Sequence, residues 1–290
     1  ATGITIFSLR AVDIHGNESN SIEEEIYIVQ SNLADGNNLI SLPGYLENTN
    51  SQDLMNEIIN NGTDIAFLLT QGFGLFNTDD GWSGNLTNVN PYSGYWINTS
   101  NVYTWDLLFE GGGIQNCEFY PTSIGNNLVS YKWGSGNSPT LDALGGEAFA
   151  TENFNFILGQ GFGLFNTADG WSGNLTNLLE GKGYWINING DVDFRWGFDS
   201  CEAPTNTPTL AKQENPIPEV FRFIQSTEQA FYLINKLTVD GKYPEAEDLI
   251  LAYHNDILIG SAVYNSEMIP LPVMGRDLSE QTVGFIEVGQ

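Results

Sequence analysis

The strongest constraint on the fold is a stretch that occurs twice in the chain. Residues 71–88 read QGFGLFNTDDGWSGNLTN and residues 160–177 read QGFGLFNTADGWSGNLTN, so that only Asp79 and Ala168 differ. The segments on either side also repeat at a constant spacing of 89 residues, without a gap. An internal repeat of this kind predicts two tandem modules with the same fold.

Short apolar runs, such as NNLISLP and GYWIN, predict β-strands in the modules, and the apolar residues alternate in the closing strand at Tyr103, Trp105 and Leu107. One helix is expected at residues 51–62, with Ser51 as N-cap and Gly62 as its C-terminal stop. In the second module the corresponding segment contains Gly145 and Gly146, which disfavour a helix. We therefore predict a mainly β protein with tandem modules, one short helix in the first of them, and partial β-sandwich domains on either side.

The modules resemble tandem NLISLP…GYWI repeats found in secreted and cell-surface proteins of bacteria and archaea. The RAVDIHGNES segment before them resembles the end of a fibronectin type III-like (Ig-like) domain. The FRFIQSTEQAFY segment after them resembles a β-sandwich domain of large secreted bacterial proteins. These resemblances imply an extracellular location and name no activity. They divide the chain into 1–33 (last fibronectin-like strands), 34–115 and 116–202 (modules), 203–218 (proline-rich linker) and 219–290 (β-sandwich-like domain).

The net charge of the chain limits the classes of partner that it can bind. The chain has 36 acidic and 9 basic residues and a net charge of -27. Such a field repels phosphate backbones and anionic lipids, so we expect no nucleic-acid binding. No apolar run approaches the roughly 20 residues of a membrane span, so we expect no membrane insertion. The acidic excess serves either solubility or the binding of cations, above all Ca²⁺.

Cys117 and Cys201 lie on either side of the second repeat. A disulfide between them would close a loop of about 84 residues and stabilise the module by roughly 4 kcal/mol. It would also indicate an oxidising exterior. The alternative is two unrelated free thiols.

The duplicated DDGWSGN turn is the best candidate for a binding site. Its Asn and Asp oxygens could ligate Ca²⁺, although the spacing is not that of an EF-hand. Ala168 replaces one carboxylate in the second copy, which favours a hydrogen-bonded structural turn instead. The weak calcium candidates are Asn77, Asp79 and Asp80 in this turn and Asp13 and Asn17 near the N-terminus.

Trp82 and Trp171 occupy the same position in the two turns. Exposed there, they could stack on sugar rings, so a glycan-binding face is one interpretation. The other is that they fill the cores of small β-modules. No HExxH, CxxC, GxSxG or phosphate-loop pattern occurs, and we expect no enzyme.

The predicted function is a non-catalytic structural component of a secreted or cell-surface protein, such as a stalk, appendage, filament or surface-layer-like assembly. Its partners would be neighbouring copies or domains of the same protein, joined by strand addition. The alternatives are a carbohydrate-binding or adhesin module, with glycans as partners, and an accessory region of a secreted hydrolase.

Overall fold

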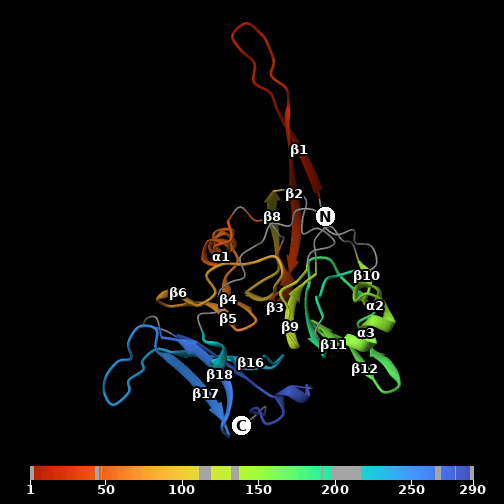
Figure 1. Cartoon of the computed structure of the whole chain (residues 1–290). Coiled ribbons are helices and arrows are strands. Elements are labelled where there is room, and N and C mark those ends of the chain that lie inside the picture. The colour runs from red at the N-terminus through yellow and green to blue at the C-terminus, as the bar shows by residue number, and fades with distance from the viewer. Residues whose placement is uncertain are drawn as a thin grey trace.

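The structure is a computed structural model, which describes residues 3–42, 46, 48–110, 119–131, 137–190, 192–197, 217–264, 269–277 and 279–287. The described chain is mainly β, with 46% strand in several antiparallel sheets and three α-helices. The predicted fold class is confirmed. Figure 1 shows the module sheets and the C-terminal strands in one body, from which an N-terminal hairpin projects.

The first module is a five-stranded antiparallel sheet. Across the sheet the strands are β3 (Gly36–Ser41), β7 (Gly94–Thr99), β4 (Ile65–Thr70), β5 (Phe73–Thr78) and β6 (Gly81–Gly84). Helix α1 (Ser51–Asn60) packs on one face and buries Leu54, Met55 and Ile58 against the apolar side chains of the sheet. These are the residues that the helical periodicity predicts for the apolar stripe.

The cap of α1 differs from the prediction. Asn50 rather than Ser51 is the N-cap, and its Oδ1 accepts a hydrogen bond from the backbone N–H of Asp53 at 3.0 Å. Ser51 lies buried in the first turn of the helix. Both residue types favour the cap, but Asn50 has the extended backbone that the position needs. Gly62 follows the helix with φ +96°, as expected for a C-terminal stop.

The second module repeats the strand order of the first. Across its sheet the strands are β9 (Gly125–Ser130), β15 (Gly183–Ile188), β11 (Phe154–Gly159), β12 (Phe162–Thr167) and β13 (Gly170–Gly173). A two-stranded sheet of β10 (Ser138–Pro139) and β14 (Asn177–Leu178) lies beside it. Each strand of the first sheet therefore has a counterpart 89 residues later in the second.

The helical segment of the second module was underestimated from the sequence. It forms two short helices, α2 (Thr140–Ala143) and α3 (Glu147–Asn153). Gly145 and Gly146 lie between them with φ of +96° and +92°. The glycine pair thus acts as a bend between helices, because it accepts a backbone conformation that other residues rarely adopt.

The N-terminal hairpin consists of β1 (Gly3–Leu9) and β2 (Ile22–Leu33). Strand β2 ends at the predicted boundary after residue 33, but it pairs with β8 (Tyr103–Glu110), which belongs to the predicted first module. The order β1-β2-β8 makes a three-stranded sheet. The tip, residues 10–21, is exposed and lies far from the rest of the molecule in Figure 1.

Residues 217–287 form a further β unit, called here the C-terminal unit. Strands β17 (Leu249–His254) and β18 (Ile257–Val263) form an antiparallel hairpin that turns at Asn255 and Asp256, both with positive φ. Residues 221–241 contribute one strand, β16 (Gln229–Ile234), whose partner β19 (Ile269–Met274) lies further along the chain. The elements are η2 (Glu219–Phe221), β16 (Gln229–Ile234), β17 (Leu249–His254), β18 (Ile257–Val263), β19 (Ile269–Met274) and η3 (Glu280–Thr282).

Candidate functional site

The duplicated turn is held by its own polar side chains. Thr78 donates from Oγ1 to the carbonyl oxygen of Gly81 at 2.7 Å, and Asn77 donates from Nδ2 to the carbonyl oxygen of Ile65 at 3.0 Å. Oδ1 of Asn85 accepts from the backbone N–H of Gly74 at 2.8 Å. The second copy makes the corresponding bonds through Thr167, Asn166 and Asn174. Most polar side chains of the turn therefore form hydrogen bonds with the backbone of their own module.

The calcium candidates lie apart in the structure. Asp79 and Asp80 are exposed in the turn, whereas Asn77 points its amide nitrogen at the backbone. Asp13 and Asn17 lie at the tip of the hairpin and bond to each other. Among the described residues, no group of three or more His, Cys, Asp or Glu side chains is arranged to hold a metal ion.

Asp13 organises the tip of the hairpin. Its Oδ1 accepts from the backbone N–H groups of His15 and Asn17 at 2.8 and 2.9 Å, and its Oδ2 accepts from Nδ2 of Asn17 at 2.7 Å. The bond from the Asn17 side chain is the main cause that holds the pKa of Asp13 below its ordinary value. This is an Asx-type turn, in which a side chain replaces a backbone acceptor.

Trp82 and Trp171 are half-buried and pack against the cores of their modules. The indole N–H of Trp82 donates to Oδ1 of Asn56 at 2.7 Å, and that of Trp171 donates to Oγ1 of Thr151 at 2.9 Å. Each tryptophan thus ties its turn to the helical side of the module. This arrangement matches the structural interpretation of the two rings more closely than an open sugar platform.

The two modules meet through a pair of glutamines that the sequence did not single out. Gln160 accepts at Oε1 from the backbone N–H of Leu39 at 2.9 Å and donates from Nε2 to the carbonyl oxygen of Asn37 at 2.7 Å. Gln71, its counterpart, bonds in the same way to Leu128 at 2.9 Å and Asn126 at 3.0 Å. The contacts are reciprocal, so the modules are related by an internal two-fold pseudosymmetry.

Backbone and apolar contacts follow the same symmetry. Ser41 donates its backbone N–H to the carbonyl oxygen of Gly181, and Ser130 donates to that of Tyr92, both at 2.9 Å. A Cβ at Gly94 or Gly183 would come within 2.9 Å of the facing strand, so both positions require glycine. Between the sheets lies a small apolar cluster of Leu39, Leu128 and Trp185 with Trp96 and Leu158.

The C-terminal unit docks on a surface to which both modules contribute. Asn126 of β9 donates from Nδ2 to Oδ2 of Asp277 and to the carbonyl oxygen of Gln225, each at 2.9 Å. From the other module, the ring of Phe76 lies 5.4 Å from that of Phe231. A cavity of about 280 Å³ remains at this junction, lined by residues that include Asn126, Gln225 and Gln281.

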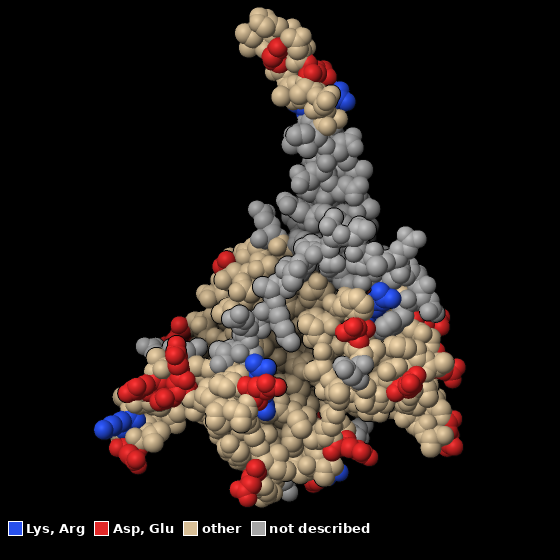
Figure 2. All heavy atoms as spheres, in the orientation of Figure 1, with Lys and Arg blue, Asp and Glu red and all other residues tan. Residues whose placement is uncertain are grey.

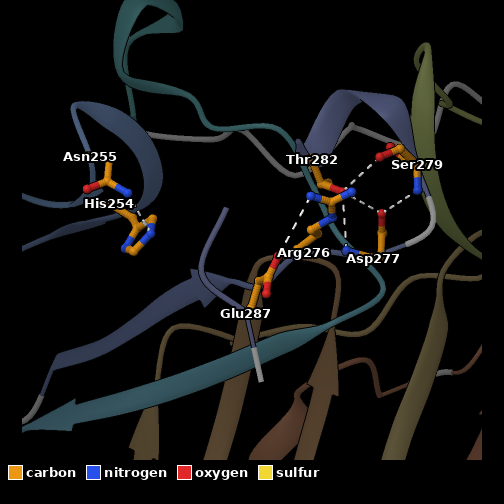
Figure 3. Close-up of polar contacts among 7 residues, drawn as sticks. All are labelled: His254, Asn255, Arg276, Asp277, Ser279, Thr282 and Glu287. Atoms are coloured by element: carbon orange, nitrogen blue, oxygen red, sulfur yellow. Dashed lines mark hydrogen bonds and ion pairs between the residues drawn. The ribbon is translucent and has the colours of Figure 1, made fainter. Parts of the chain in front are cut away.

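Asp277 is the polar centre of this junction (Figure 3). Its Oδ1 accepts from Oγ1 of Thr282 at 2.7 Å and from the backbone N–H of Ser279 at 2.8 Å, while its Oδ2 also accepts from the backbone N–H of Thr227 at 2.8 Å. Burial alone would raise the pKa of the Asp277 carboxyl. The hydrogen bonds, first among them that from Thr227, outweigh burial, so the pKa lies below its ordinary value.

Acidic side chains are spread over the drawn face in Figure 2, with few basic ones among them. Only two ion pairs occur among the described residues, Arg10 with Glu18 and Arg276 with Glu287, and both are exposed. Cys117 and Cys201, the predicted disulfide partners, lie outside the described residues. No helix in the described part of the chain is long and apolar enough to span a membrane.

In comparisons with known proteins, no family model, curated protein or solved structure matches the chain.

Proposed function

We propose that the chain is a non-catalytic structural region of a secreted or cell-surface protein, in which β modules pack in series. The observation that carries the proposal is the use of the repeated polar side chains. Asn77 and Asn85 bond to their own module, and Gln71 bonds to the next one. A structural element requires polar side chains that hold its modules in place, and the repeated side chains have this use.

Strand addition is the proposed mode of contact with neighbouring copies. In the three-stranded sheet β1 is an outer strand, paired on one side with β2. An outer strand presents backbone N–H and C=O groups that a strand of another chain can pair with. The projecting hairpin in Figure 1 places this strand away from the body, where a neighbouring copy has access.

The carbohydrate-binding alternative depends on Trp82 and Trp171. Both indole N–H groups are engaged in hydrogen bonds within the module, and both rings pack against its core. A sugar would stack on the remaining half of each ring, without the indole N–H to orient it. The structural role is the better-supported of the two.

The proposal is tested on cells of the source. Antibodies against the purified chain are applied to intact cells and to lysed cells, before and after brief treatment with an external protease. We expect labelling of intact cells or of the medium, and loss of cell labelling after the protease. Signal that appears only after lysis and resists the protease would contradict a surface location. Non-reducing electrophoresis of the same material checks the Cys117–Cys201 bridge.

A further inference from the structure

The internal pseudosymmetry has a consequence for binding. Because the two modules are equivalent, a surface built from one part of one module and a different part of the other must occur twice, with the modules exchanged. The surface that holds the C-terminal unit, called here the occupied surface, includes Gly72, Phe76, Gly125 and Asn126. Its counterpart, called here the open surface, includes Gly161, Phe165, Gly36 and Asn37.

The open surface has the same internal geometry as the occupied one. Nδ2 of Asn98 donates to Oδ1 of Asn37 at 2.7 Å, as Nδ2 of Asn187 donates to Oδ1 of Asn126 at 2.7 Å. Each asparagine amide is therefore fixed with its oxygen toward the sheet and its nitrogen left to donate elsewhere. On the occupied surface that nitrogen binds Asp277.

The open surface carries no such partner among the described residues. Asn126 is 2% exposed, whereas Asn37 is exposed. A Cβ at Gly125 would collide with the side chain of Gln281, but one at Gly36 would meet nothing within 4 Å. The glycine turns of the two surfaces differ in the same way. A Cβ at Gly72 would lie 3.3 Å from the side chain of Gln225, whereas a Cβ at its counterpart Gly161 would meet nothing within 4 Å.

We propose that the open surface binds the C-terminal unit of a second copy of this chain, with Asp277 of that copy accepting from Nδ2 of Asn37. On the occupied surface this unit is held by the equivalent groups: the fixed amide of Asn126, the turn at Gly72 and the ring of Phe76. The inference rests on the proposed structural role and specifies its partner. A contact of this kind is heterologous, so it can propagate from copy to copy wherever the rotation between copies does not close a ring.

Two features set the strength of this contact. The C-terminal unit belongs to the same chain as the occupied surface. Its effective concentration at that surface is therefore high, which favours docking within the chain. At the open surface Asp35 stands where Ile124 stands at the occupied one, which adds a negative charge facing an acidic chain. Association between wild-type copies is therefore weak, and salt strengthens it by screening that repulsion.

The test weakens docking within the chain and follows where the unit goes. Asn126→Asp places a carboxylate against Asp277, and Asn37→Asp makes the same change at the open surface. Molecular mass by light scattering is measured over a concentration series, together with hydrogen exchange of residues 34–38 and 160–165. We expect Asn126→Asp to associate at a concentration at least tenfold lower than wild type, with slower exchange in both segments. The double variant should lose both effects, and Asn37→Asp alone should stay monomeric.

Other outcomes overturn the proposal. An Asn126→Asp chain that remains monomeric at every concentration, whether or not exchange slows, excludes binding to a second copy. Association that persists in the double variant excludes the open surface as its site. Both results leave the cell-labelling test of the proposed function unaffected, so the two failures are distinguishable.

A second variant tests the same proposal if Asn126→Asp does not fold. Phe76→Ser removes the aromatic contact with Phe231 while leaving β9 and its buried asparagine intact. We expect the same association as for Asn126→Asp, again abolished by Asn37→Asp. Phe165→Ser, the counterpart change, is the matched control and should not promote association; if it does so equally, the effect is not specific to docking within the chain.

Discussion

Gln160 completes the edge of strand β3 at Leu39: its Oε1 accepts from the Leu39 backbone N–H at 2.9 Å, and its Nε2 donates to the carbonyl oxygen of Asn37 at 2.7 Å. A side-chain amide thus stands in for the peptide group of a neighbouring strand. Gln71 does the same for β9. Free strand edges invite pairing with other chains, so the two modules protect each other at the edges that would otherwise be open.

Removing this amide should destabilise the module pair. Gln160→Ala leaves the N–H of Leu39, a buried residue, without a partner, and such a loss costs about 1–3 kcal/mol. Gln160→Glu is the matched change: it keeps the acceptor but places an oxygen against the carbonyl of Asn37. We expect both variants to unfold in less urea than wild type. Stability equal to wild type in both would show that water replaces the amide at no cost.

The internal repeat allowed much of the fold of the two modules to be predicted from the sequence. A constant spacing of 89 residues requires equal strand order, and both five-stranded sheets have it. A short apolar run predicted β3, and the stripe of Leu54 and Ile58 predicted α1. Signals of this kind can be read from the sequence because apolar composition and spacing act over a few neighbouring residues.

The glycine that follows the repeated Trp-Ser should tolerate no side chain in either module. Gly84 and Gly173 have φ of +152° and +151°, and a Cβ would overlap the carbonyl oxygen of Gly74 or Gly163. We expect Gly84→Ala and Gly173→Ala to cost about 3 kcal/mol or more, from backbone strain and steric overlap together. Gly81→Ala is the control: it also has positive φ but meets nothing within 4 Å, so about 1 kcal/mol is expected. Urea unfolding of the three variants decides the comparison.

The contacts between units were not predictable from the sequence. Gln71 and Asn126 are ordinary polar residues in a chain rich in Asn and Gly, and their partners lie more than fifty positions away. The same holds for Asp277, one of many carboxylates. The sequence did preserve one usable signal: Gln71 is unchanged at Gln160, although a turn between strands does not require glutamine.

Docking of the C-terminal unit should weaken in acid. The folded-state pKa of Asp277 lies below its ordinary value of 3.8, so its contribution to stability is fully present above that value and is lost as pH falls through the lower, folded-state pKa. Asp277→Asn should cost about 2 kcal/mol at neutral pH, because charge-assisted hydrogen bonds are lost. Unfolding curves of wild type and variant should therefore converge below about pH 4. A difference that stays constant from pH 7 to pH 2 would contradict the assignment.

Calcium should have little effect on the duplicated turn. Thr78, Asn77 and Asn85 already hold it by hydrogen bonds, and the second copy keeps the corresponding bonds with Ala168 in place of Asp79. We expect Tm to change by less than about 2 °C between excess EDTA and millimolar Ca²⁺, against the roughly 4 °C or more of a site bound at 100 times Kd. Asp79→Ala is the specific control. A calcium-dependent rise in Tm that this variant abolishes would instead support the calcium site.

The two repeated tryptophans should report on packing rather than on sugars. Asn56→Ala removes the acceptor of the Trp82 indole, and Thr151→Ala removes that of Trp171; each should cost about 1 kcal/mol and alter tryptophan emission. Because both rings pack against module cores, titration with neutral and acidic oligosaccharides should leave the emission of wild type unchanged. Trp82→Phe and Trp171→Phe identify the source of any signal. A saturable change in wild type that disappears in one of these variants would favour the carbohydrate-binding alternative over the structural role.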